Sequence, residues 1–272
     1  MNRFRFFFVL LPAILLLCCF DKNTMAKNNN KENDTPMQES NFSSALSTAL
    51  NNACLPENIC SRIQKDIADS PAFSVQLFNI LQLDSYLFFL VDKEHPLAKD
   101  YEPEDLVELT NSSYRANREG LFLRSAASVS LEEMAAAAKN KGITLTASSA
   151  YRSYSYQAQV YERNVTQMGK EAADRESARA GHSQHQLGLV VDFGSITDAF
   201  AKTAEGRWLA DNASQFGWSL SYPDGFEDIT GYRWESWHYR YVGKELAQFI
   251  DTYFDGIQQY ALRFIREWML IL

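Results

Sequence analysis

The sequence predicts an α+β domain, in which helices pack around a sheet of short strands. Helical and strand-like segments interleave along the chain from about residue 63. No glycine-rich phosphate loop opens any of the helices, which argues against a nucleotide-binding doubly wound sheet. The 272 residues, 46% of them hydrophobic, can bury one sizeable core. We therefore expect one domain with extensions.

Composition and local spacing justify each element. Alanine-rich sequence followed by Gly142 predicts a helix and its end. Alternating ITLTASS predicts a strand, whereas the continuous apolar run LGLVVDF predicts a buried one. In chain order we expect a strand at 88–91, a helix at 123–141, a strand at 143–149, a helix at 154–168, a strand at 187–193, a helix at 198–216, strands near 218–221 and 232–241, and a helix from about 244.

The N-terminus is typical of an export signal. Arg3 and Arg5 form a basic start, and the apolar run 6–17 has twelve residues, whereas a bilayer-spanning helix needs about 20. Residues 16–19 (LLCC) resemble a bacterial lipobox in which Cys19 would be lipidated and anchor the chain to a membrane. Two alternatives stay open: cleavage near 24–26, or a retained anchor. Each predicts an extracytoplasmic protein, in the periplasm or cell envelope.

Net charge argues against one class of binding partner, and local composition predicts a tether that contains two cysteines. The formal net charge is -8 and the pI is near 5.1, so we expect no nucleic-acid binding, which depends on neutralising phosphates. Residues 19–60 are rich in Asn and Ser and predict a flexible polar tether. Within it, Cys54 and Cys60 are either a short disulfide loop or two unpaired thiols.

Two clusters in the second half of the chain point to a metal site. His185 and Asp192 are seven residues apart, so on an uninterrupted strand they would face opposite ways. Gly188 supplies a break, which leaves His185 in a loop and Asp192 on the strand. An acid that ends an apolar run is costly to bury unless it is paired or binds a cation.

The second cluster is WESWHYRYVG at 234–243. Glu235 and His238 are three residues apart and can face one cleft if the chain turns between them. Two histidines and one carboxylate (His185, Asp192 and His238) form a standard zinc triad with an open fourth position. Glu235 is left as a general base. Either cluster alone is weak evidence, because such spacings arise by chance and a lone histidine among aromatics often belongs to the core.

Taken together, the two clusters carry a family resemblance. Ser183-x-His185-x-x-Gly188-x-x-x-Asp192, followed by Glu235-x-Trp237-His238, resembles the signature of VanY-type D-alanyl-D-alanine carboxypeptidases, zinc peptidases of the superfamily that includes lysostaphin and the hedgehog signalling domain. The resemblance covers roughly residues 85–255. It implies a central antiparallel sheet with flanking helices, one Zn²⁺ per chain, and peptidoglycan stem peptides as the substrate.

The resemblance also implies residue roles. His185, Asp192 and His238 match the zinc ligands, and Glu235 matches the catalytic base. Arg152 matches an arginine that binds the substrate's terminal carboxylate or the developing oxyanion, which suits the forked guanidinium. Gln157 and Ser183 match polar substrate contacts, although such residues often only cap or brace a turn. His182 and His95 match no ligand position.

Departures from the family pattern weaken any fine inference about specificity. Ala180 stands where the family has proline, Gln184 where it has glutamate, and Ser236 where it has proline. The resemblance predicts a D,D-carboxypeptidase that trims the terminal D-amino acid. L,D-carboxypeptidase, D,D-dipeptidase and a non-catalytic wall-binding zinc module stay open. The expected organisation is an export signal at 1–18, the tether at 19–60, a helical lead-in at 61–84, the zinc carboxypeptidase domain at 85–255 and a helical tail at 256–272.

Overall fold

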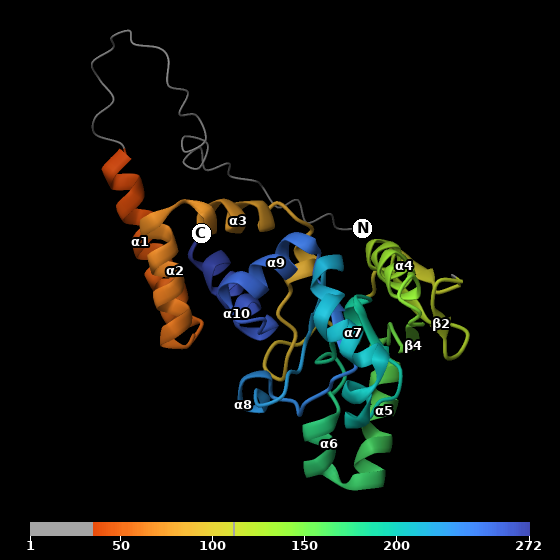
Figure 1. The fold of residues 1–272 in the computed structure, drawn as a ribbon. Coiled ribbons are helices and arrows are strands. Elements are labelled where there is room, and N and C mark those ends of the chain that lie inside the picture. Colours follow the sequence, from red (N-terminus) through yellow and green to blue (C-terminus); the bar gives the residue numbers. More distant parts are fainter. Residues whose placement is uncertain (1–34, 111) are drawn as a thin grey trace.

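The computed structural model describes residues 35–272 except residue 111. Helices and short strands interleave along this part of the chain, as the sequence predicts (Figure 1). The helices are α1 (Thr35–Asn52), α2 (Glu57–Asp69), α3 (Ala72–Ile80), η1 (Ser85–Phe88), α4 (Ser125–Lys139), α5 (Tyr154–Met168), α6 (Lys170–Glu176), η2 (Gln184–Leu187), η3 (Asp198–Lys202), α7 (Ala204–Asn212), η4 (Ala213–Phe216), α8 (Glu227–Thr230), α9 (Lys244–Tyr253) and α10 (Gln258–Ile271), where η marks a 3-10 helix. The strands are β1 (Leu106–Glu108), β2 (Arg115–Ala116), β3 (Phe122–Arg124), β4 (Thr146–Ser149), β5 (Val190–Phe193), β6 (Trp218–Leu220) and β7 (His238–Tyr241).

A five-stranded sheet in the order β2-β4-β5-β7-β6 forms the centre. The β2–β4 pair is parallel, and the other three pairs are antiparallel. The expected α+β fold with a mainly antiparallel sheet is therefore confirmed. Strand β5 is central and all four of its residues are buried, which explains its unbroken apolar sequence. Strands β1 and β3 form a separate antiparallel ribbon.

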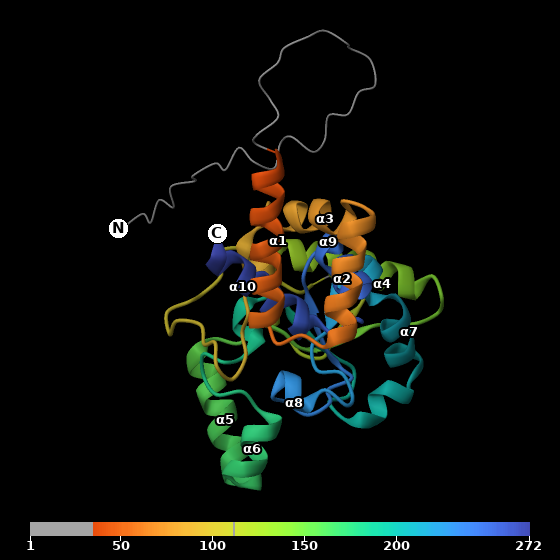
Figure 2. The same ribbon diagram turned by 90° about the vertical axis from the view of Figure 1, so that its left-hand side faces the viewer.

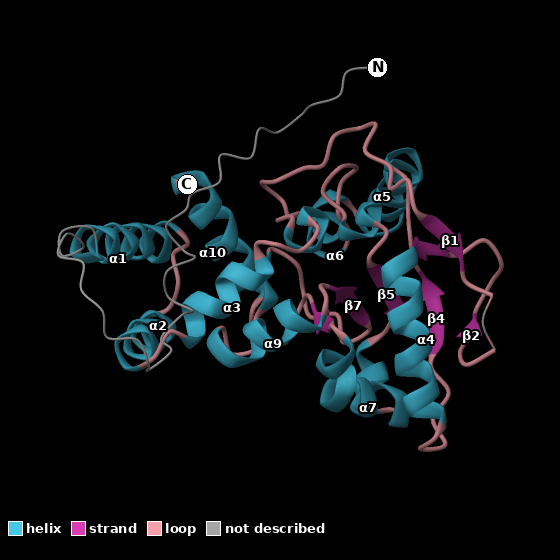
Figure 3. Cartoon of the chain, turned by 90° about the horizontal axis from the view of Figure 1, so that it is seen from above, coloured by secondary structure: helices cyan, strands magenta, loops and turns pink. Residues whose placement is uncertain are grey.

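Five helices gather on one side of the molecule. Figures 1 and 3 show α1, α2, α3, α9 and α10 together, while the strands lie on the other side. Phe73 of α3 is fully buried there, with ring centroids 4.9 Å from Tyr253 and 5.6 Å from Phe264. Helices α5 and α6 project from the end of the molecule opposite α3 (Figure 2). The hydrophobic core runs continuously from this helical group to the sheet.

The interval 19–60 differs from the expected tether. From Thr35 it forms α1, and α2 begins at Glu57. Leu46 and Leu50 are 4% and 2% exposed, and Phe42 meets Trp268 of α10 edge to face at 5.3 Å. The polar composition of this interval obscured an apolar stripe at helical spacing, because the stripe is narrow. The helix that it packs against, α10, lies more than 200 residues away in the sequence.

Three further expectations need correction. Residues 88–91 form no strand; the 3-10 helix η1 ends at Phe88 and an irregular segment follows. The helix expected at 198–216 is divided into η3, α7 and η4, with Thr203 capping α7 through its side chain. The C-terminal helix is interrupted at Asp255 and Gly256, which both have positive φ. In the two expected helices, local turn chemistry overrides continuous helical composition.

The predictions for the first residues, including lipidated Cys19, lie outside the described residues. In the described part of the chain, none of the helices combines the length and apolar character needed to cross a bilayer. Cys54 and Cys60 are both free thiols in this structure.

Candidate metal centre and cleft

The three predicted ligands converge from three elements. His185 lies on η2, Asp192 on β5, and His238 opens β7. Gly188 ends η2 with a left-handed φ of 70°, so the chain turns from His185 into the strand, as the spacing predicts. Asp192 pairs directly with His238 across the β5–β7 ladder. The ligand atoms of the three residues all lie within 4.8 Å of one another.

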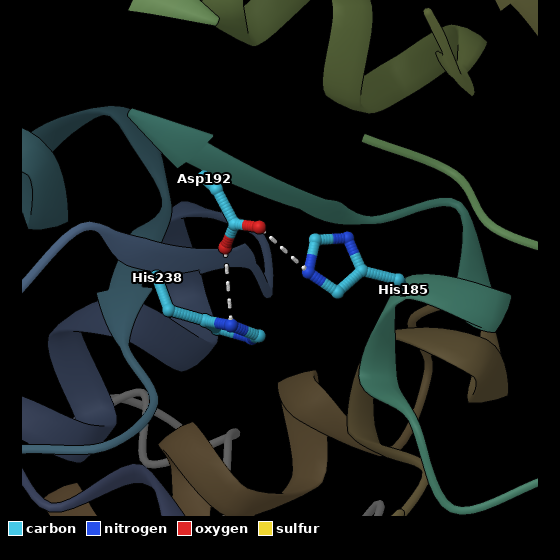
Figure 4. A group of neighbouring side chains, drawn as sticks. All are labelled: His185, Asp192 and His238. Atoms are coloured by element: carbon cyan, nitrogen blue, oxygen red, sulfur yellow. Dashed lines mark ion pairs between the residues drawn. The ribbon is translucent and has the colours of Figure 1, made fainter. Parts of the chain in front are cut away.

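The orientation of these side chains suits a cation. His185 Nδ1 donates a hydrogen bond to the Ala150 carbonyl at 2.6 Å, so its Nε2 carries the lone pair. That Nε2 lies 3.2 Å from Asp192 Oδ2, yet it is buried without a hydrogen-bond partner (Figure 4). His238 Nδ1 lies 3.3 Å from Asp192 Oδ1. Two of these converging electron-pair donors, His185 Nε2 and Asp192 Oδ1, are buried without a hydrogen-bond partner in the described part of the chain, as in a divalent-cation site. Imidazole and carboxylate are both ligands of zinc.

The charges of the cluster are consistent with such a site. Burial and the Arg152 charge lower the pKa of His185 to about 4, which keeps it a neutral ligand. Burial alone would lower the pKa of His238, but Asp192 and Glu235 outweigh it and raise it to about 8. Burial opposes the charge on Asp192, yet the two imidazoles hold the pKa of that carboxyl well below its usual range. The cluster therefore stabilises positive charge beside Asp192.

Glu235 stands at the edge of the cluster. Its Oε2 lies 3.0 Å from His238 Nδ1, and its side chain is only 14% exposed. The backbone N–H of His238 donates to the Glu235 carbonyl at 3.1 Å, which is the local turn that the spacing requires. Burial raises the pKa of Glu235, which favours its use as a proton acceptor and donor near neutral pH.

Arg152 approaches the cluster from the segment between β4 and α5. Its Nη2 donates to Asp192 Oδ2 at 3.2 Å and its Nη1 to Gln157 Oε1 at 2.9 Å, while its buried Nε has no partner among the described residues. Gln157 Nε2 in turn donates to the Ala178 carbonyl at 2.6 Å. Gln157 is 1% exposed and both ends of its amide are engaged, so the geometry favours a role in orienting Arg152.

Ser183 has a structural role in this arrangement. Its hydroxyl accepts from the His185 backbone N–H at 3.3 Å and caps η2. It also lines the cleft with the six other candidate residues, so the structure brings all seven to one cleft. This cleft has a volume of about 320 Å³.

Aromatic side chains that the sequence did not mark as site residues also wall the cleft. Tyr222 stacks on His238 with ring centroids 4.6 Å apart, and Tyr232 lies 5.1 Å from Tyr222. Trp237 also lines the cleft and is 4% exposed. Tyr222 lies in the loop SYPDGF and Tyr232 in the loop GYRWES. Neither loop has a periodic pattern that could have identified these tyrosines as site residues.

The remaining histidines lie outside the cluster, as expected. His95 Nδ1 is 2.8 Å from Asp92 Oδ1 in a local loop. His182 Nδ1 donates to the Asp92 carbonyl at 2.8 Å. Neither faces the three ligands.

Comparison with known proteins places this architecture in a family. Residues 120–244 match the family model described as VanY, D-alanyl-D-alanine carboxypeptidase. YodJ of Bacillus subtilis is 36% identical over 193 residues, covering 66% of this chain and 71% of that protein. A D-alanyl-D-alanine carboxypeptidase of Enterococcus faecium is 28% identical over 183 residues, covering 62% of this chain and 58% of that protein.

Two solved structures share the fold. The LdcB LD-carboxypeptidase has a TM-score of 0.55 and 36% identity, covering 62% of this chain and 85% of its own. The vancomycin resistance D,D-pentapeptidase VanY from a VanB-type cassette, solved in complex with Zn(II), has a TM-score of 0.54 and 32% identity, covering 63% and 96%. The chain belongs to the VanY family of D-alanyl-D-alanine carboxypeptidases, which are zinc peptidases.

Proposed function

We propose that this chain is a zinc-dependent D,D-carboxypeptidase that removes the terminal D-amino acid from peptidoglycan stem peptides. One observation carries the proposal: a cation site, a spare carboxylate and a guanidinium share one cleft. The cation site is His185, Asp192 and His238, the carboxylate is Glu235, and the guanidinium is Arg152. An enzyme that removes one C-terminal residue needs each of these groups.

The roles of the side chains follow from their positions. When bound by the triad, zinc supplies Lewis-acid polarisation of the scissile carbonyl and lowers the pKa of water to about 7. Arg152 clasps the C-terminal carboxylate and so aligns the peptide for loss of its last residue. Glu235 takes a proton from the attacking water and transfers it to the leaving amine. A C–O bond forms as the C–N bond breaks, and the products are the shortened peptide and a free amino acid.

A second candidate is L,D-carboxypeptidase activity. The resemblance to the LdcB LD-carboxypeptidase, at 36% identity, favours it. The two activities differ in the residue before the scissile bond, which is D in one case and L in the other. Kinetics on a pentapeptide ending in D-Ala-D-Ala and a tetrapeptide ending in L-Lys-D-Ala separate them. Release of the intact D-Ala-D-Ala dipeptide identifies dipeptidase activity instead.

The decisive experiment compares the native protein with Glu235→Gln, which keeps the shape of the side chain. We expect native protein with zinc to release D-alanine, and chelator or the substitution to reduce turnover at least about 10²-fold. Zinc content is measured in both proteins, because a variant that loses the metal tests nothing about the base. Wall binding without turnover by the native protein would support the non-catalytic zinc module.

We also infer a location in the cell envelope, with Cys19 as the lipidated residue. The basic start, the apolar run 6–17 and the LLCC sequence support it. Metabolic labelling with radioactive palmitate in a bacterial host tests it: Cys19→Ala abolishes labelling, whereas Cys18→Ala, the matched control, retains it. Labelling that survives in Cys19→Ala contradicts the assignment.

A further inference from the structure

A second hollow opens beside the metal cleft. It has a volume of about 230 Å³ and shares Ser177 and Tyr232 with that cleft, so the two adjoin. Its other lining residues are Lys93, Asp174, Arg179 and His182. The proposed peptidase mechanism uses none of these four.

Of the three cations in and beside this hollow, two arginines form salt bridges with described residues and Lys93 does not. Arg179 donates to Asp174 at 3.0 and 2.9 Å. Arg175 pairs similarly with Glu227, at 2.6 Å for the second bond of the fork. Among the residues that the structure describes, Lys93 forms no salt bridge, although its charge helps to lower the pKa of Glu227, which is already paired with Arg175. Two arginines and two acids cancel, which leaves the ammonium of Lys93 as surplus positive charge at the mouth of the hollow.

The Lys93 side chain is exposed but contacts two neighbours. Its methylene stem runs along Gly231, where an added Cβ would come within 3.1 Å of Lys93 Cδ. Its ammonium lies 4.9 Å from the centroid of the Tyr232 ring, a cation–π contact. The side chain is therefore directed to the boundary between the two hollows.

Hydrogen bonds from buried side chains of β7 and η2 hold the segment that carries Lys93. Arg240, fully buried, donates to the Leu87 carbonyl at 3.0 Å, and Gln186 donates to the carbonyls of Ala98 and Tyr101 at 3.0 Å. Both donors neighbour metal ligands in the sequence, on β7 and η2. The adjacent Asp92 turns inward, where its carboxylate accepts from Gln259 at 2.7 Å and faces His95 rather than the hollow. The wall is thus preorganised relative to the metal site.

We propose that this hollow binds a second carboxylate of the substrate peptide, on the acyl side of the scissile bond, with Lys93 as the specificity-determining residue. The inference rests on the proposed function. The C-terminal carboxylate is assigned to Arg152, and a departing D-alanine carries no other acid. A further carboxylate can therefore come only from residues that precede the scissile bond. An ammonium without a salt-bridge partner at the edge of this hollow recognises such a group by charge.

The test uses synthetic peptides that end in D-Ala-D-Ala. Glutamate or its neutral isostere glutamine is placed one or two residues before this dipeptide, giving two matched pairs that locate the carboxylate along the peptide. We expect the native protein to prefer one glutamate peptide over its glutamine partner in kcat/KM by about three- to tenfold, the range of a partly exposed ion pair to a fixed cation. The preference shrinks as ionic strength rises.

Substitution of Lys93 identifies the source of the preference. In Lys93→Met the glutamate-to-glutamine ratio falls to about one, and in Lys93→Arg it is retained. Lys99→Met is the matched control, because Lys99 is exposed on the same segment and does not line the hollow. Zinc content and thermal stability confirm that each variant is folded.

The two proposals fail in different ways. Absence of turnover on every peptide by zinc-loaded native protein overturns the proposed function. Turnover with no preference between glutamate and glutamine in either pair, or a preference that Lys93→Met retains in full, overturns the carboxylate site and leaves the peptidase assignment intact.

Discussion

Loss of one zinc ligand should remove most of the stability that zinc confers on the fold. The ligands lie on η2, β5 and β7, and the first and last are 53 residues apart in sequence, so the unfolded chain offers no comparable site. Zinc at 100 times its Kd then stabilises the native state by about 2.7 kcal/mol. For a domain of this size, that raises Tm by about 5–11 °C. Loss of a residue that supports a ligand weakens metal binding by about 10- to 100-fold. His185→Ala removes a ligand itself, so with a Kd at least about 100-fold weaker it retains at most about 0.4 kcal/mol at the same zinc concentration, or about 1–2 °C.

Thermal unfolding followed by circular dichroism, with zinc and with chelator, measures both shifts. The difference between the two conditions cancels the cavity that the substitution itself leaves. Glu235→Gln is the control, because it leaves the three ligands intact and should keep the full zinc shift while losing turnover. The assigned triad would be refuted if zinc did not change the Tm of the native protein, or if zinc raised the Tm of His185→Ala by as much as that of the native protein.

Three further outcomes are expected. Arg152→Lys should lower kcat/KM about tenfold or more, because an ammonium cannot form the guanidinium fork, and a peptide with a C-terminal amide should not register the change. Phe73→Ala should cost about 3–5 kcal/mol in urea unfolding, since its ring is fully buried. Burial opposes the charge on Asp92, but hydrogen bonds from Glu94 N–H and His95 outweigh it and lower its pKa from 3.8. Its contribution is therefore full above pH 3.8 and is lost as pH falls through the lower folded value, so Asp92→Asn should flatten that acid limb in stability measurements.

Much of the metal site could be predicted from the sequence, because one part of its geometry, the turn between His185 and Asp192, is local. The odd spacing of His185 and Asp192 demanded a break, and Gly188 provides it with a left-handed φ. The pairing of Asp192 with His238 needed only two strands side by side. The family resemblance added Arg152, whose contact with Asp192 spans 40 residues and has no local signal.

Long-range packing set the limit of prediction. Lys93 lines the second hollow on a segment that buried Arg240 and Gln186 hold at Leu87 and Ala98. The sequence around Arg240 and Gln186 gives no sign of this role. The segment 89–91 is likewise apolar, but it pairs with none of the described strands, and bends follow it at 92–95. In both cases the position of the segment reflects tertiary contacts that periodicity does not encode.

The most consequential difference from the sequence prediction is α1, and it can be tested in the intact chain. A flexible tether would tolerate any substitution, whereas a packed helix would not. Leu50 is 2% exposed in the core, so Leu50→Ala should lower the free energy of unfolding by about 2–5 kcal/mol. Ser47→Ala, on the exposed side of the same helix, should change it by less than about 0.5 kcal/mol. Urea midpoints that coincide for the two variants would mean that α1 does not contribute to the stable core, and the boundary of the folded domain would return to the end of the predicted tether.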